Sequence, residues 1–170
     1  MYSTFAWGKF TQQGGFTKFG IQRNNPGDHD VQFDIRFCGI CHTDVHYADP
    51  NAKLTKYPLV PGHELAGVVT KVGCKVEDVS IGDEVGVGVI SDSCMDCNQC
   101  SEGEEQACEK GVTMTYNNDT VHGHIQTGTG FSQGGYSGSM TVHRRYIVKV
   151  PKGYPLEKTG PILCAGISSE

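Results

Sequence analysis

The most informative part of the sequence reads Cys41-His42-Thr43-Asp44-Val45-His46 and, after a loop, Pro61-Gly62-His63-Glu64. It places thiol, imidazole, hydroxyl and carboxylate groups close together, and Cys with His suits zinc, copper or iron better than magnesium or calcium. Cys41 and His63 need a third ligand from elsewhere, for which Cys164 is the obvious distant candidate. A Cys, His, Cys set leaves a tetrahedral ion one open position, as in a catalytic zinc site.

A second motif is a run of four cysteines separated by two, two and seven residues: Cys94, Cys97, Cys100 and Cys108. Four thiolates can close around a tetrahedral ion and stabilise a polar lobe over residues 91–111 that has little other core. A closed sulfur shell indicates a structural zinc. An iron–sulfur cluster is an alternative, although the ferredoxin run ends with a gap of three and Cys-Pro, whereas Glu109 follows here. Disulfides are a weaker alternative.

The composition limits the classes of protein. A chain of 170 residues is long enough for one domain and short for two, so we expect residues 1–170 to form one unit. The net charge of -5 leaves only His143-Arg144-Arg145 as a cationic cluster, which argues against nucleic-acid binding. No apolar run approaches the roughly 20 residues of a membrane span. The start, Met1-Tyr2-Ser3-Thr4, shows no secretory signal. We therefore expect a cytoplasmic protein with no membrane partner.

The apolar pattern predicts a mainly antiparallel β-structure with short helices. The clearest strand covers 31–37, where apolar and polar residues alternate, so that one face is expected to be buried and the other wet. A short helix is expected at 42–48. The other expected elements are a hairpin of strands 2–10 and 16–22, strands at 65–72, within 81–89 and at 139–150, a long loop at 113–138 and an irregular tail from 151. Together they predict a partly open β-barrel with extra lobes.

These motifs together resemble the zinc-dependent medium-chain alcohol dehydrogenases, in particular the cinnamyl alcohol dehydrogenase branch. The matching stretches are Cys38-Gly39-Ile40-Cys41-His42-Thr43-Asp44-Val45-His46, Tyr57-Pro58-Leu59-Val60-Pro61-Gly62-His63-Glu64, Gly82-Asp83-Glu84-Val85-Gly86-Val87-Gly88, Thr115-Tyr116-Asn117, Gln133-Gly134-Gly135-Tyr136 and Leu163-Cys164-Ala165-Gly166-Ile167. The resemblance covers essentially the whole chain. It implies a GroES-like catalytic domain, here a partly open β-barrel with a zinc-binding lobe, from an oxidoreductase that acts on small alcohols or aldehydes.

Carried over position by position, the resemblance implies two zinc ions per chain. Cys41, His63 and Cys164 would hold the catalytic zinc, and Glu64 matches a carboxylate that can approach it as a fourth ligand. The lobe cysteines Cys94, Cys97, Cys100 and Cys108 would hold the structural zinc.

The resemblance also implies a reaction. Thr43 would accept a hydrogen bond from the alcohol, and His46 would pass the proton towards solvent through the cofactor ribose. Zinc would lower the alcohol pKa so that an alkoxide forms, and the alkoxide would transfer hydride to NAD or NADP. In reverse, the same site would reduce an aldehyde.

Judged without the resemblance, several residues have simpler interpretations. Thr43 could be a helix cap, and Glu64 could be a solvated carboxylate. Cys38 and Cys74 are expected to be small buried core residues. The remaining histidines are expected to be local structural or surface residues: His29, His42, His122, His124 and His143.

The sequence departs from the family in two respects. Residues 117–132 look longer than in this branch, and no G-x-G-x-x-G motif occurs in a strand–turn–helix context. A Rossmann domain is therefore expected to be missing from this chain, and the isolated chain is expected to be inactive. The parent enzyme would be a homodimer or tetramer. Because Cys164 lies near the end of the sequence, weaker metal retention is expected there than in the lobe.

Two functions from other classes remain open at this point. One is a non-enzymatic zinc-binding interaction module, against which the set Cys41, Thr43, His46 and His63 speaks, because a scaffold does not require it. The other is an iron–sulfur electron carrier.

Overall fold

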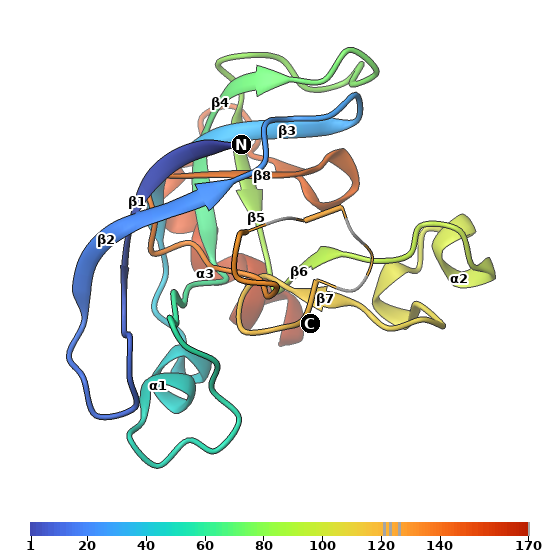
Figure 1. Cartoon of the computed structure of the whole chain (residues 1–170). Coiled ribbons are helices and arrows are strands. Elements are labelled where there is room, and N and C mark those ends of the chain that lie inside the picture. The colour runs from blue at the N-terminus through green and yellow to red at the C-terminus, as the bar shows by residue number, and fades with distance from the viewer. Residues whose placement is uncertain (121, 123, 126, 170) are drawn as a thin grey trace.

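The computed structural model describes residues 1–120, 122, 124–125 and 127–169. The strands are β1 (Tyr2–Gly8), β2 (Thr17–Arg23), β3 (Asp30–Cys38), β4 (Leu65–Val72), β5 (Glu84–Val87), β6 (Ile90–Asp92), β7 (Thr113–Met114), β8 (Ser139–His143) and β9 (Val148–Lys149). The helices are α1 (His42–Ala48), α2 (Asn98–Ser101) and α3 (Thr159–Pro161), with short helical turns η1 (Glu105–Ala107), η2 (Arg144–Tyr146), η3 (Leu156–Lys158) and η4 (Ile162–Gly166). The predicted mainly β fold with short helices is confirmed (Figure 1).

A five-stranded antiparallel sheet lies at the centre of the molecule, with the strand order β8-β3-β4-β5-β9. Two register shifts interrupt the pairing of β3 with β4, one between Gln32 and Phe33 and one between Ile35 and Phe37. Such shifts bend a strand and increase its twist. This curved sheet corresponds to the partly open barrel that the sequence predicts.

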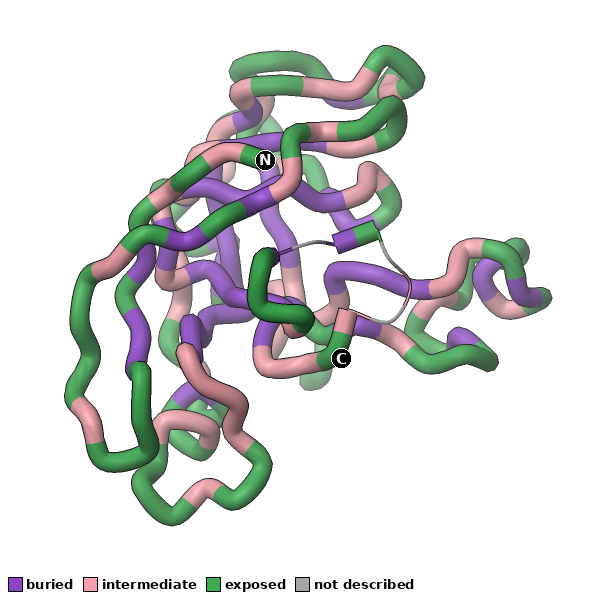
Figure 2. The backbone as a smooth tube through the Cα atoms, viewed as in Figure 1, coloured by how far each residue is buried: buried purple, intermediate pink, exposed green. Residues whose placement is uncertain are grey.

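The inner face of the sheet forms the main core, visible as the buried segments in Figure 2. Phe33, Leu65 and Val85 are completely buried there. Burying a side chain of this size contributes roughly 1.5–3 kcal/mol, so this face holds the sheet together. The predicted alternation along 31–37 is wrong at its end: Phe37 is 45% exposed. The register shift before it turns its side chain away from the core.

The first two strands form the predicted hairpin. β1 pairs antiparallel with β2 from Tyr2 opposite Arg23 to Gly8 opposite Thr17. The hairpin packs on the rest of the molecule through a small cluster of Ala6, Ile21 and Val60. It therefore adds a separate layer beside the central sheet (Figure 1).

Several predictions about the second half of the chain are wrong. The expected strand 139–150 is interrupted, because η2 turns the chain after His143 and only Val148–Lys149 pairs again, with β5. The tail from 151 is not irregular: it forms η3, α3 and η4 in succession. Cys74, expected in the core, is exposed, since it lies in the turn after β4.

The segment expected to be one long loop at 113–138 also contains regular structure. β7 pairs with β6, and Asp119 forms an isolated bridge with Phe131. Next to this bridge, the backbone N–H of Ser132 donates to Asn118 O at 2.8 Å, which also joins the two sides of the segment. Positions 121, 123 and 126 of the predicted loop 117–132 lie outside the described residues.

Within the part of the chain that the structure describes, no helix has the length and the apolar character needed to cross a bilayer.

Candidate metal centres

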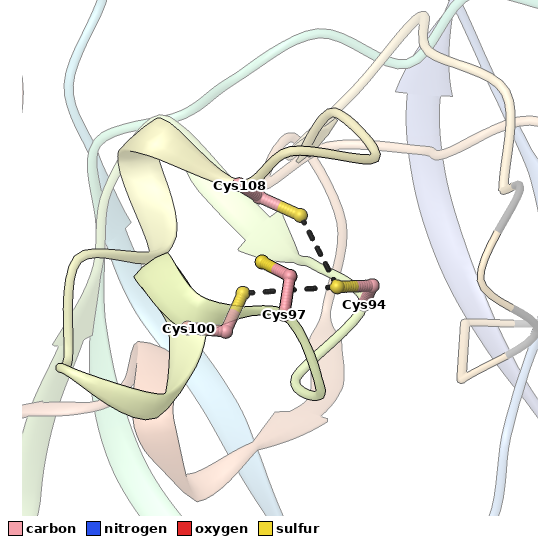
Figure 3. A group of neighbouring side chains, drawn as sticks. All are labelled: Cys94, Cys97, Cys100 and Cys108. Carbon is pink, nitrogen blue, oxygen red and sulfur yellow. Dashed lines mark hydrogen bonds between the residues drawn. The ribbon is translucent and has the colours of Figure 1, made fainter.

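Four cysteines converge in the segment 91–111, which we call the cysteine lobe (Figure 3). Their Sγ atoms, from Cys94, Cys97, Cys100 and Cys108, all lie within 4.8 Å of one another. Cys94 Sγ is 3.5 Å from Cys108 Sγ and 3.9 Å from Cys100 Sγ. All eight cysteines of the chain are free thiols, so the structure gives no support to the disulfide alternative. Four thiols at these distances can surround one tetrahedral ion.

The cysteine lobe has almost no other core. Its buried cluster consists of Cys97, Cys100 and Cys108, and among the described residues the partly buried hydrophobic side chains packed against it are Cys94 and Val112. Hydrophobic burial alone therefore stabilises this lobe weakly, and an ion bound by the thiols would supply the missing stabilisation.

Backbone groups favour the thiolate form of one lobe cysteine, Cys97, whereas a hydrogen bond with Asp96 raises the pKa of Cys94 and burial raises that of Cys100. Hydrogen bonds from the backbone N–H of Cys100 and of Glu109 lower the pKa of Cys97 to about 6. Ser93 Oγ lies 3.3 Å from Cys100 Sγ. Arg145 donates to Cys100 O at 2.8 Å, which ties the lobe to the end of the central sheet.

A second group, which we call the mixed cluster, contains Cys41, His63, Glu64 and Cys164. One ligand atom from each lies within 4.8 Å of the others. Cys41 is the N-cap of α1, His63 and Glu64 precede β4, and Cys164 belongs to η4. Cys41 Sγ is 3.9 Å from Cys164 Sγ. The structure thus brings together the three ligands expected from the sequence and the candidate fourth.

Asp44, a residue that the sequence analysis did not select, organises the mixed cluster. It is 3% exposed, and its carboxylate accepts from the backbone N–H of Cys41 at 2.9 Å and of Gly62 at 3.0 Å. The carboxylate oxygen also lies 3.4 Å from His63 Nδ1. This pairing leaves His63 Nε2 for a metal, because a ligating histidine engages a carboxylate through its other nitrogen. The spacing Cys41-x-x-Asp44 at a helix start was a signal that could have revealed it.

The charges around the mixed cluster are strongly coupled. Burial opposes a charged imidazole at His63, but the hydrogen bond and the charge of Asp44 outweigh this and raise the pKa of His63. Burial raises the pKa of Glu64, and the charge of His63 partly opposes that rise. Burial and then the neighbouring Cys41 thiol raise the pKa of Cys164 to about 11. A hydrogen bond from the backbone of Thr43 lowers the pKa of Cys41, so the two thiols of the cluster are shifted in opposite directions.

Glycines allow the backbone to approach the mixed cluster. A Cβ atom on Gly39 would lie 1.9 Å from Glu64 Oε2, and one on Gly160 would lie 2.6 Å from Glu64 O. Gly62 adopts φ +101°, which a side chain would strain. A side chain at Gly39 or Gly160 would therefore displace Glu64.

A cavity of about 100 Å³ lies beside the mixed cluster. It is lined by Thr43, Tyr47, His63, Val89, Met114, Thr115 and Tyr116. The hydroxyl of Thr43 lies 3.6 Å from Cys41 Sγ, so this predicted site residue borders both the cluster and the cavity. His46 does not line the cavity; it is exposed on α1, and its ring meets that of His42.

Tyr116 is a further residue of the site for which composition and spacing gave no signal. It is 5% exposed, its ring stacks on His63 with 5.7 Å between the ring centroids, and it meets Tyr47 edge-on at 5.4 Å. This stacking restricts the orientation of the His63 ring.

Both clusters fit zinc by the chemistry of their donors. The lobe offers four sulfur atoms, and the mixed cluster offers two sulfur atoms, one imidazole nitrogen and one carboxylate. Zinc accepts both sets, and the hydrogen-bonded His63 has the arrangement expected of a metal ligand.

The family described as "Alcohol dehydrogenase GroES-like domain" matches residues 27–152 of the chain. A probable cinnamyl alcohol dehydrogenase from Oryza sativa is 43% identical over 162 residues, which is 95% of this chain and 43% of the rice protein. An NADP-dependent alcohol dehydrogenase from Mycobacterium tuberculosis is 46% identical over 152 residues, 89% of this chain and 42% of that protein. The chain thus spans less than half the length of these relatives.

Solved structures give the same fold. A cinnamyl alcohol dehydrogenase from Sorghum bicolor superposes with a TM-score of 0.88 at 37% identity, covering 98% of this chain and 46% of the sorghum chain. The cinnamyl alcohol dehydrogenase of Helicobacter pylori, solved with NADP(H), gives 0.86 at 37% identity and covers 98% of this chain and 47% of its own. The GroES-like fold expected from the sequence is therefore confirmed.

Proposed function

Because the chain belongs to the alcohol dehydrogenase GroES-like domain family, we propose that it is the catalytic-domain part of a zinc-dependent alcohol dehydrogenase or aldehyde reductase. The observation that carries the proposal is the mixed cluster beside the cavity: His63 belongs to both. A substrate oxygen in the cavity would thus lie next to the metal ligands. The resemblance to NADP-dependent and cinnamyl alcohol dehydrogenases supports the reaction class and favours NADP over NAD.

In this proposal Cys41, His63 and Cys164 hold the catalytic zinc, with Glu64 as an exchangeable fourth ligand, and the four lobe cysteines hold a structural zinc. When bound, the catalytic ion supplies Lewis-acid chemistry that lowers the pKa of an alcohol or polarises an aldehyde carbonyl. Asp44 keeps the His63 ring oriented and is itself held by two backbone N–H groups.

The residues of α1 would manage the proton. Thr43 borders the cavity and would accept a hydrogen bond from the substrate hydroxyl. His46 lies one turn further along α1 at the surface, where it would release the proton to solvent. The apolar lining residues Val89 and Met114 would exclude water from the rest of the substrate.

The hydride carrier would be held outside these 170 residues. The chain has no G-x-G-x-x-G motif in a strand–turn–helix context, and it spans less than half the length of its relatives. We propose that a nucleotide-binding domain of the same protein binds NADP or NAD beside the cavity, in a cytoplasmic homodimer or tetramer.

The proposal is tested by metal analysis together with an assay. Elemental analysis should find two zinc ions per chain, with one lost in Cys41→Ser and the other in Cys97→Ser. The protein that includes the nucleotide-binding domain should reduce aldehydes with NADPH, and Cys41→Ser should abolish this. The 170-residue chain alone should not. Material with no zinc would refute the proposed metal sites. Robust aldehyde reduction by the 170-residue chain would refute the proposal that the hydride carrier is held outside these residues.

A further inference from the structure

The side chains of helix α1 point in three different directions. Residues four apart in a helix lie on the same side. Thr43 and Tyr47 line the cavity, and Asp44 points into the protein against His63. The remaining side carries His42 and His46, which are both exposed. The proposed reaction uses His46 alone and gives no function to the pair.

The two rings of this pair are in contact. Their centroids are 4.5 Å apart and their planes are inclined by 70°. The separation of four residues equals that of the two histidines in the H-E-x-x-H helix, where both imidazoles bind one zinc ion. The two rings are therefore close enough for one ion to bridge them.

The other histidines show why this pair is distinctive. In the part of the chain that the structure describes, a ring nitrogen is already engaged in four of them: His63 with Asp44, His122 with Gly111 O, His124 with Asp92 and His143 with the backbone N–H of Arg145. No hydrogen bond of the described residues involves the ring of His42 or His46. Both imidazoles can therefore turn a free nitrogen towards an ion.

We propose that His42 and His46 form a third, exposed metal site for a divalent transition ion such as Ni²⁺, Cu²⁺ or excess Zn²⁺, with water completing the coordination. Imidazole is a suitable ligand for these ions. Because only two protein ligands take part, the site binds reversibly and more weakly than either cysteine-containing cluster.

The site would have a regulatory consequence that rests on the proposed function. A metal ion on His46 occupies the nitrogen that would receive the proton, so excess metal would inhibit the enzyme without displacing the catalytic zinc. The metal site itself does not depend on that function. A chain that binds the ion but belongs to no dehydrogenase would still support the site.

The test uses the 170-residue chain with both clusters loaded with zinc. Ni²⁺ is titrated by calorimetry, and the zinc content is measured before and after. One Ni²⁺ should bind per chain with no release of zinc. His42→Asn and His46→Asn should each weaken this binding by roughly a hundredfold, the gain expected from a second ligand held beside the first.

The matched control is the other close pair, His29 and His143, whose ring centroids are 5.7 Å apart but whose His143 is already engaged. His29→Asn should leave Ni²⁺ binding unchanged. The proposal is overturned if the chain binds no Ni²⁺, if Ni²⁺ releases zinc stoichiometrically, or if His29→Asn weakens binding as much as His46→Asn does. Circular dichroism of the variants shows whether α1 has kept its fold.

Discussion

The cysteine lobe and the mixed cluster bring their candidate metal-ligating side chains together by opposite routes. The lobe takes its four thiols from one short stretch, Cys94 to Cys108, and would offer an ion sulfur alone. The mixed cluster takes ligands from positions as far apart as Cys41 and Cys164, and combines sulfur, nitrogen and oxygen. The first depends on local chain geometry, whereas the second exists only when the central sheet, α1 and η4 are in place.

In both regions the local environment shifts thiol pKa values in both directions. Backbone N–H groups lower the pKa of Cys97 to about 6, so a lobe thiolate forms near neutral pH. Burial and the neighbouring Cys41 raise the pKa of Cys164 to about 11, and Glu64 is shifted towards its neutral form. A hydrogen bond with Asp96 raises the pKa of Cys94, and burial raises that of Cys100, whereas a backbone hydrogen bond from Thr43 lowers that of Cys41. In both regions an ion would therefore have to displace protons from some of the thiols.

The largest expected effect follows from Cys100→Ser in the lobe. Cys100 is fully buried and belongs to a cluster that consists almost only of cysteines. Structural zinc contributes roughly 10–16 kcal/mol to folding in zinc-finger peptides, so losing one of four thiolates should unfold the lobe. Zinc should fall from two ions to one, and limited proteolysis should cut within 94–111 while the central sheet stays intact.

The control for that variant is Cys74→Ser, because Cys74 is an exposed cysteine that belongs to neither cluster. It should change the free energy of unfolding by less than about 0.5 kcal/mol and leave both ions bound. A lobe that stays protected from protease after Cys100→Ser would show that its fold does not depend on the ion.

A chelator should separate the two regions without any substitution. The lobe cysteines Cys97, Cys100 and Cys108 are buried, whereas Cys41 and Cys164 of the mixed cluster are only half-buried. Mild dialysis against EDTA should therefore remove the ion of the mixed cluster almost completely before the lobe loses its own. Cobalt-substituted protein makes the order visible, because four-sulfur and mixed-ligand sites absorb differently. Equal loss of the ion from the lobe and from the mixed cluster would contradict this prediction.

The difference between the regions also explains what could be predicted from the sequence. The lobe was predictable because the spacing of Cys94, Cys97, Cys100 and Cys108 confines the possible geometry. The distant residue Cys164 could be proposed as a ligand only from ligand chemistry and the family resemblance. No local pattern indicates that η4 lies beside α1, and the same tail was predicted to be irregular.

Other errors have a common physical origin in tertiary contacts. The exposure of Phe37 follows from a register shift in β3, which alternation along one strand cannot reveal. The break after His143 depends on Arg144, whose guanidinium bonds Asp78 and Ile147 O. Asp44 was overlooked because its partners, the N–H of Gly62 and the His63 ring, come from a segment that only the fold brings near.

Asp44→Asn should weaken the mixed cluster and spare the lobe. The amide keeps the shape of the carboxylate but loses the charge that holds His63, and removing such a partner typically costs 10–100-fold in metal affinity. Competition with a fluorescent zinc chelator should show this loss at one of the two sites. Asp34→Asn is the matched control, since Asp34 is half-exposed on β3 and its carboxylate lies 3.7 Å from the exposed guanidinium of Arg36. Equal weakening of both sites would indicate general destabilisation.

The smallest effect concerns His143, which connects the central sheet to the lobe. Its ring accepts the backbone N–H of Arg145, and Arg145 in turn donates to Cys100 O. Burial lowers the pKa of His143 below its ordinary value of 6.5, and the charge of Asp30 partly opposes this. Three positive neighbours lower the pKa further, namely His29, Arg145 and His124. The unfolded chain therefore binds this proton more readily than the folded one. The stabilisation is complete above pH 6.5 and declines as the pH falls below it.

His143→Asn should remove this pH dependence, because its side-chain oxygen can still accept from Arg145 N–H but does not titrate. The measurement is the urea midpoint of wild type and variant between pH 7.5 and 5.5. Proton competition at the metal ligands is common to both proteins and cancels in the difference. As the pH falls, the urea midpoint of the variant should exceed that of the wild type by a growing amount. The wild type should also release the lobe ion at a higher pH than the variant. Parallel pH curves would mean that the lobe is held by its ion alone, independently of the sheet from which it projects.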